Sequence, residues 1–161
     1  MSFLVGARVS LCPLSINDLE GGYSEWINSQ ENDYFTQHAQ FPHTRESLVQ
    51  YFNQKSQSKN DLWLAIKLNE NNKHIGNIEI GQIDWVHKRG TYAILLGDPE
   101  ESGKGYAFEA SELIIEHAFN KLNLHRIQLG VHEHNSAAIN LYKKIGFKEE
   151  GVWREYFLRN G

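Results

Sequence analysis

The segment Ser102-Gly103-Lys104-Gly105-Tyr106-Ala107 lies between the apolar run Ile94-Leu95-Leu96 and a stretch with helical periodicity. Glycines let a backbone approach an anion closely, and the unpaired N–H groups of a first helical turn point toward such an anion. The helix dipole adds roughly 0.3 to 1 kcal/mol per charge at an exposed site. The same residues would also suit a plain turn that starts a helix. The segment therefore indicates either a phosphate-binding turn or an ordinary start of a helix.

A second motif runs from Asn135 through Tyr142 to Phe147. Asn135 suits the N-cap of a short helix that ends at Gly146, and Tyr142 suits a half-buried aromatic position on that helix. Each residue alone has this simple structural explanation. The two motifs occur in a fixed order, however, and each follows a predicted strand, which favours a shared function.

The hydrophobic periodicity predicts one mixed sheet flanked by helices, an α/β (α+β) fold in a single domain over residues 1–161. The second half of the chain contains strand-helix-strand units. The expected helices cover 16–29, a stretch after Thr44, a stretch after Gly105 and 135–146. The expected strands cover 8–14, 62–68, 74–86, 91–97, 126–132 and 147–158.

Composition excludes several classes of protein. The formal net charge is -4 without a lysine-rich block, so the electrostatic signature of a nucleic-acid binder is missing. Cys12 is the only cysteine, which rules out an internal disulfide and a cysteine-based zinc cluster. No run reaches membrane-spanning length, and the N-terminus is too weakly apolar for a signal peptide. We therefore expect a soluble, cytoplasmic protein without membrane or nucleic-acid partners.

Residues 74–157 closely resemble the GNAT acetyltransferases. Leu122-Asn-Leu-His-Arg-Ile127, followed by Asn135 and Tyr142, is most similar to the bacterial ribosomal-protein and spermidine N-acetyltransferase branches. The resemblance implies an N-acetyltransferase that uses acetyl-CoA as co-substrate and whose fourth and fifth strands splay apart.

The resemblance also implies the positions of the cofactor site. In the family the glycine turn binds the pyrophosphate, the end of the fourth strand pairs with the pantetheine, an asparagine holds the pantetheine arm and a tyrosine acts as general acid beside the sulfur. The corresponding residues for cofactor binding are Leu95, Leu96, Gly97, Ser102, Gly103, Lys104, Gly105, Tyr106, Ala107 and Asn135. The corresponding catalytic acid is Tyr142.

Two positions depart from the family pattern. Ser102 replaces a glutamine or arginine, which removes one side chain but keeps the backbone N–H groups. Tyr92 occupies the position where many relatives carry a glutamate base, so the base cannot be transferred from the family. The remaining candidates for it are Glu79, Asp84, His132 and His134, with Glu79 as the chosen one. His132 and His134 share a face of their predicted strand, but without a third ligand we expect no metal site.

The amine acceptor stays open between a polyamine, an amino sugar and a protein N-terminus. In the family the first two helices and their connection select the acceptor. That connection, residues 30–43, contains four candidate substrate-binding residues, namely Glu31, Tyr34, Phe35 and Phe41. A different class of function, a module that binds acyl-CoA without turnover, is compatible with the absent glutamate, whereas Tyr142 favours catalysis.

The C-terminal residues predict a hairpin turn at Asn160-Gly161 after the strand 147–158. Similar enzymes continue through such a turn into a final strand, so the last strand of the family is expected to be missing here. An uncovered strand edge that carries Trp153, Tyr156 and Phe157 would invite pairing with another chain. We therefore expect another chain or another segment to cover this edge, which favours a homo-oligomer, most simply a dimer. The alternative is that the sequence is a truncated form from which the last strand was lost.

Overall fold

The structure is a computed structural model that describes residues 1–29 and 41–158. Its centre is a six-stranded sheet in the order β1-β2-β3-β4-β5-β6. The strands are β1 (Leu4–Val5), β2 (Val9–Pro13), β3 (Leu62–Leu68), β4 (His74–Asp84), β5 (Arg89–Leu96) and β6 (Arg126–Gln128). Neighbouring strands pair antiparallel up to β5, and β5 pairs parallel with β6. The predicted mixed sheet is therefore confirmed.

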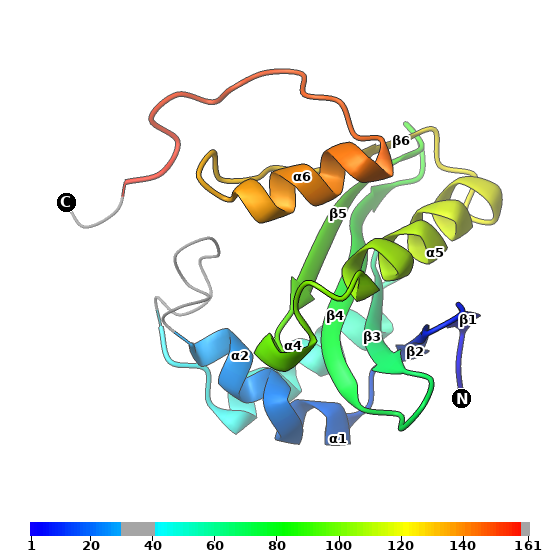
Figure 1. Cartoon of the computed structure of the whole chain (residues 1–161), viewed down its shortest axis with the longest axis vertical. Coiled ribbons are helices and arrows are strands. Elements are labelled where there is room, and N and C mark those ends of the chain that lie inside the picture. Colours follow the sequence, from blue (N-terminus) through cyan, green and yellow to red (C-terminus); the bar gives the residue numbers. More distant parts are fainter. Residues whose placement is uncertain (30–40, 159–161) are drawn as a thin grey trace.

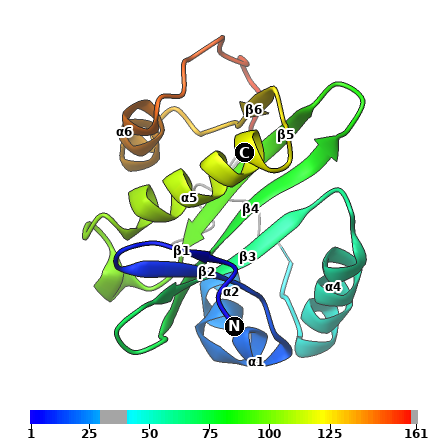
Figure 2. The ribbon, with the colours of Figure 1, turned by 90° about the vertical axis from the view of Figure 1, so that its right-hand side faces the viewer.

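Helices cover both faces of this sheet (Figures 1 and 2). One face carries α5 (Tyr106–Asn120), and α6 (Ser136–Ile145) lies beside α5 at the β6 edge. The other face carries α1 (Ile16–Asp18), the π-helical η1 (Leu19–Tyr23), α2 (Ser24–Asn28) and α4 (Arg45–Gln57). A short 3-10 helix, η3 (Pro99–Glu101), connects β5 to the start of α5.

Two hydrophobic clusters hold these layers together. The larger one lies under α5, where Ile114 and Ala118 pack against strand residues such as Ile66, Ile78 and Ile80, all fully or almost fully buried. The smaller one joins the first helices to the opposite face through Leu19, Tyr23, Ile27 and Leu48. The two clusters lie on opposite faces of the sheet, because successive side chains along a strand such as β4 point to opposite faces.

Several boundaries differ from the prediction. The expected helix over 16–29 is divided into three segments, because Gly21 leaves helical geometry with φ -89° and ψ -146°. β6 ends at Gln128 rather than at residue 132. β1 is an additional short strand that pairs with β2 through Leu4↔Leu11 and Val5↔Ser10.

The expected strand over 147–158 is wrong: these residues are described and form no strand. They leave α6 as an irregular segment with a turn at residues 154–155 that arches past α6 (Figure 1), and Glu150 forms an ion pair with Arg126 of β6. A strand needs a partner for its backbone hydrogen bonds, and no described strand pairs with this segment. Apolar content alone therefore did not make it a strand.

Candidate functional site

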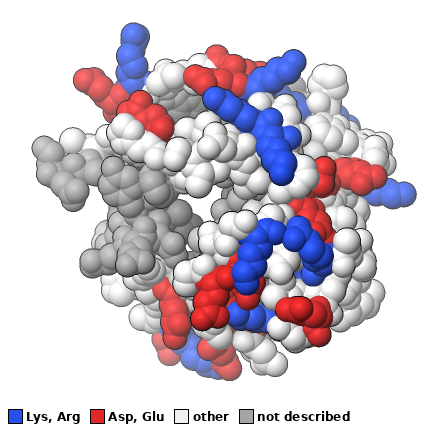
Figure 3. All heavy atoms as spheres, in the orientation of Figure 1, with Lys and Arg blue, Asp and Glu red and all other residues white. Residues whose placement is uncertain are grey.

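An opening in the sheet forms where β5 and β6 part. The two strands pair only through Arg89↔Arg126, Gly90↔Ile127 and Thr91↔Gln128, while β5 continues to Leu96. Beyond Thr91 the edge of β5 that faces β6 therefore has no partner strand among the described residues. Figure 3 shows a hollow on this face of the molecule, between α6 and the start of α5. The predicted splay of these two strands is present, and Leu95, Leu96 and Gly97 lie at its open end.

The glycine turn leaves the N-terminus of α5 uncapped. Gly103 and Gly105 adopt left-handed backbone conformations, with φ of 75° and 85°. Gly105 is the N-cap residue, and no side chain caps the helix there. By contrast, Thr44 caps α4 and Asn135 caps α6 with side-chain oxygens. The first N–H groups of α5 thus lack side-chain acceptors, which fits the pyrophosphate of CoA.

Lysines and carboxylates surround this turn. The Lys104 ammonium lies 2.8 Å from Glu101 Oε2, and the Lys73 ammonium lies 2.8 Å from Asp98 Oδ2 and 3.2 Å from Glu101 Oε1. The hydrogen bond that Lys104 donates to Glu101 raises the pKa of Lys104. Both lysines therefore stay charged beside the turn, and both are ion-paired with Glu101.

Tyr142 comes from α6 and lies in a half-buried aromatic cluster beside the opening. Its ring meets the rings of Tyr92 and Phe147 at centroid distances of 5.8 and 6.0 Å. Burial raises the pKa of Tyr142. The phenol is therefore protonated at neutral pH, as a proton donor must be.

Asn135 uses its side-chain oxygen to accept a hydrogen bond from the N–H of Ala138 at 3.1 Å. The cap function expected of this residue is therefore present. The cap occupies the oxygen and leaves the two N–H groups of the carboxamide as donors for other partners.

Tyr92 is almost fully buried in the core beneath α5, with 3% of its surface exposed. Its hydroxyl lies 2.7 Å from Ser111 Oγ, and Ser111 Oγ donates to the carbonyl of Ala107 at 2.5 Å. Because the single hydroxyl proton of Ser111 goes to Ala107, the Tyr92 hydroxyl donates to Ser111. A residue in this arrangement is a donor and offers no base.

Glu79 projects from β4 to the face opposite Tyr142, since its neighbours Ile78 and Ile80 point into the cluster under α5. Its carboxylate forms an ion pair with Lys55, which also contacts Asp61 Oδ1 at 2.8 Å. Burial raises the pKa of Glu79 and outweighs the contacts with Lys55.

The other candidates for the base lie elsewhere. Asp84 binds His87 and Arg89 in the hairpin between β4 and β5, and hydrogen bonds from His87 lower its pKa to about 2. The rings of His132 and His134 meet at 5.2 Å. Within residues 1–29 and 41–158, no group of three or more potential ligands could hold a metal ion.

The predicted acceptor site is only partly visible. Glu31, Tyr34 and Phe35 lie outside the described residues. Phe41 is described and 77% exposed.

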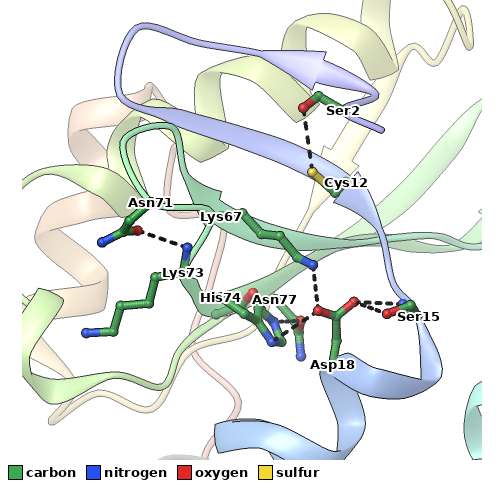
Figure 4. A network of polar contacts seen from close by, with 10 residues as sticks. Ser2, Cys12, Ser15, Asp18, Lys67, Asn71, Lys73, His74 and Asn77 are labelled. Carbon is green, nitrogen blue, oxygen red and sulfur yellow. Dashed lines mark hydrogen bonds and ion pairs between the residues drawn. The ribbon is translucent and has the colours of Figure 1, made fainter.

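A partly buried polar network joins α1 to β3 and β4 and has no counterpart in the sequence prediction (Figure 4). Asp18 accepts hydrogen bonds from Lys67 at 2.6 Å and from the backbone N–H of Ser15 at 2.8 Å. His74 Nδ1 lies 4.0 Å from Asp18, and the His74 ring meets the Trp26 ring at 5.1 Å. The signal that could have suggested this network was the capping pattern of Ser15 and Asp18.

The Trp26 indole covers Gly97 so closely that a Cβ at this position would overlap the ring. Gly97 is therefore needed for packing at the end of β5, where the pantetheine was expected. The network below Trp26 fixes the position of the indole.

Comparison with known proteins agrees with this geometry. Residues 8–148 match the family model described as an acetyltransferase (GNAT) domain. Spermidine N(1)-acetyltransferase of Escherichia coli strain K12 is 38% identical over 86 residues, which are 53% of this chain and 46% of that protein. The chain thus aligns with about half the length of the curated relatives it first matches.

Solved structures match over almost the whole chain. The structure of spermidine N-acetyltransferase from Vibrio cholerae in complex with CoA and spermine has a TM-score of 0.87 at 26% identity and covers 97% of this chain and 90% of that one. A dodecameric structure of the Vibrio cholerae enzyme has a TM-score of 0.80 at 27% identity and covers 97% and 88%. Among the described residues, no helix has the length and apolar character to span a membrane.

Proposed function

Because the chain belongs to the GNAT acetyltransferase family, we propose that it transfers an acetyl group from acetyl-CoA to a primary amine. GNAT enzymes use acetyl-CoA, and the similar structure of the Vibrio cholerae enzyme is a complex with CoA. The observation that carries the proposal is the joint position of two features at one opening. The uncapped N-terminus of α5 lies at one end of the opening. Tyr142, on α6, lies beside the same opening.

The turn and the first turn of α5 would hold the pyrophosphate through backbone N–H groups. A Cβ at Gly103 would meet no atom within 4 Å, so the backbone is open to a bulky anion at this position. The proposed contacts of the turn involve Ser102, Gly103, Lys104, Gly105, Tyr106 and Ala107. Leu95, Leu96 and Gly97 would pair with the pantetheine through the free edge of β5, and Asn135 would donate from its carboxamide nitrogen.

The thioester of acetyl-CoA supplies an acyl carbon that a neutral amine attacks, so that a C–N bond forms and the C–S bond breaks. Tyr142 gives its phenolic proton to the departing sulfur and recovers it from solvent. A thiol with a pKa near 8.5 is a tolerable leaving group, and the phenol of Tyr142, whose pKa is raised by burial, still carries the proton that the departing sulfur needs. Such assistance is typically worth about 10²- to 10⁴-fold in rate.

Glu79 is the proposed acceptor for the proton that the amine loses. Burial raises the pKa of Glu79 toward neutral pH, so its carboxylate accepts a proton more readily than an ordinary glutamate does. Glu79→Gln is expected to lower turnover and to alter the acidic limb of the pH–rate profile. Asp84→Asn, in the hairpin between β4 and β5, is the control. It should leave both the turnover and the acidic limb of the pH–rate profile unchanged. An unaltered profile in Glu79→Gln would remove Glu79 from the mechanism.

The proposed acceptor is a primary amine of a polyamine, of an amino sugar or of a protein N-terminus. The Vibrio cholerae neighbour binds spermine in its crystal structure, which supports a polyamine. The test mixes the protein and acetyl-CoA with spermidine, glucosamine or a peptide with a free N-terminus, and measures thiol release. Release with one of them, and its loss in Tyr142→Phe, is the expected result. Calorimetric binding of acetyl-CoA without thiol release would instead favour an acyl-CoA-sensing module.

We also propose that the chain forms a homo-oligomer, most simply a dimer. Relatives with the same fold include a dodecameric enzyme. The segment after α6 exposes several large apolar side chains, namely Val152, Trp153, Tyr156, Phe157 and Leu158. Sedimentation at micromolar concentration should show an assembly larger than a monomer, with Trp153 fluorescence shifted by burial. A well-behaved monomer would contradict the proposal.

A further inference from the structure

Arg8 reaches from the turn before β2 to the glycine turn, almost a hundred residues later in the chain. Its Nη1 donates to the carbonyl of Lys104 at 2.8 Å, and its Nε donates to Glu109 Oε2 at 3.0 Å. The guanidinium carbon also lies 4.9 Å from the centre of the Tyr106 ring. One side chain thus contacts the turn itself and the first helical turn of α5.

The backbone of Arg8 is held in place from both sides. The N–H groups of Arg8 and Val9 donate to Glu109 Oε1 at 2.7 and 3.2 Å. The carbonyl of Arg8 accepts from the N–H of Asn69 at 2.9 Å. Since Glu109 binds both the backbone and the side chain of Arg8, the direction of the guanidinium relative to α5 is fixed.

The contact with Lys104 controls the orientation of a peptide group in the turn. The peptide between Lys104 and Gly105 is planar and trans, so its N–H points opposite to its C=O. Arg8 holds the C=O, and the N–H of Gly105 therefore points away from Arg8. Glycine allows many backbone conformations, and an external contact is needed to keep one of them populated. Arg8 supplies that contact beside Gly103 and Gly105.

We propose that Arg8 is a positioning residue for the co-substrate: it holds the Lys104–Gly105 peptide so that the glycine turn is ready for a pyrophosphate before binding. The proposal rests on the proposed function, because it concerns the same turn. The role assigned to Arg8 is to act through the turn, since its Nε and Nη1 already bind Glu109 and the carbonyl of Lys104. Pre-ordering of this kind strengthens binding by lowering the entropy that the turn loses when the ligand arrives.

The experiment compares Arg8→Ala and Arg8→Lys with Arg89→Ala. Arg89 is a matched control, since its side chain is 53% exposed and ion-paired with Asp84 in the distant hairpin, while that of Arg8 is 51% exposed. Calorimetry with CoA and steady-state kinetics are measured for each folded variant. Arg8→Ala should weaken CoA binding and raise the KM for acetyl-CoA about tenfold while kcat changes less than about threefold.

Arg8→Lys keeps the charge beside Glu109 but cannot bind two acceptors in a fork, so an intermediate loss is expected. Because Arg8→Lys retains the ion pair with Glu109, this variant can test the effect on CoA binding if Arg8→Ala does not fold. Arg89→Ala should bind CoA like the unchanged protein. The positioning role is overturned if the folded Arg8 variants bind CoA normally, or if Arg89→Ala loses as much affinity. Failure of the unchanged protein to bind CoA would instead overturn the proposed function.

Discussion

The rings of Tyr92 and Tyr142 meet edge to face, with centroids 5.8 Å apart and planes at 83°. Tyr92 is anchored by Ser111, and Ser111 is anchored by the carbonyl of Ala107 in the first turn of α5. A continuous chain of contacts therefore connects the proposed acid on α6 with the helix that begins at the glycine turn. The hydroxyl of Tyr92 thus serves to anchor its ring between α5 and α6.

Tyr142→Phe removes the phenolic proton and keeps the ring that packs against Tyr92. We expect turnover to fall by about 10²-fold, because general acid assistance is lost. The affinity for CoA, measured by calorimetry, should stay within about twofold of normal, since the ring packing is preserved. Equal turnover in both forms would show that Tyr142 is only a packing residue.

Tyr92→Phe removes a buried hydroxyl and leaves an acceptor site of Ser111 without its donor. The free energy of unfolding should fall by about 1 kcal/mol, which corresponds to a decrease in Tm of roughly 2 to 4 °C for a chain of this size. Turnover should change little, because the edge-to-face contact with Tyr142 remains. Tyr156→Phe is the control, since Tyr156 is 60% exposed. A large loss of turnover in folded Tyr92→Phe would assign the hydroxyl a direct chemical role.

Gly103→Asp is expected to abolish CoA binding. The variant places a negative charge beside the proposed pyrophosphate site, and it also strains a backbone with φ of 75°. Gly103→Ala carries the same strain without the charge and therefore separates the two effects. We expect Gly103→Ala to keep measurable affinity by calorimetry. Unchanged affinity in folded Gly103→Asp would show that the anion binds elsewhere.

Asp18→Asn tests the buried network on the opposite face. Burial alone disfavours the charged carboxyl, but hydrogen bonds from Lys67 and Ser15 outweigh it and lower the pKa of Asp18. Asp18 therefore stabilises the fold above its unfolded pKa of about 3.9, and this contribution is lost as the pH falls through the lower folded pKa. The variant leaves Lys67 buried without its partner, so a loss of about 3 kcal/mol is expected at pH 7.

Urea denaturation at pH 7 and between pH 5 and 3 measures this difference. The gap between the unchanged protein and Asp18→Asn should narrow as the pH falls below about 4. Glu100→Gln is the control, since the Glu100 side chain is 82% exposed. A gap that stays constant down to pH 3 would contradict the role of the ionised carboxyl.

Local patterns in the sequence predicted most of the fold. Alternating apolar residues identified Leu62–Leu68 as a strand, and the structure places β3 at these residues. Thr44 and Asn135 were recognisable as caps, because an oxygen on a short side chain bonds to the N–H three residues later. The candidate residues on the glycine turn and α6 followed from the family resemblance, and their roles remain predictions.

Two of the differences from the prediction have one physical cause, the dependence on partners far away in the chain. Residues 147–158 have the apolar content of a strand but no neighbouring strand to pair with among the described residues. Lys55 of α4 binds Glu79 of β4, which lies 24 residues later in the chain, so the environment of that carboxyl could not be deduced from the residues around it in sequence.

Sequence alone determined where the helices start, which residues alternate along the strands, and that Gly146 ends the helix after Asn135, because these properties depend on neighbours within a few residues. Tertiary structure alone decided that Arg8 holds the carbonyl of Lys104, that Trp26 covers Gly97 and that β5 parts from β6 after Thr91. Contacts of this kind join residues that are distant in the chain, and only the packing of α5 and the first helices on the sheet brings them within reach of one another.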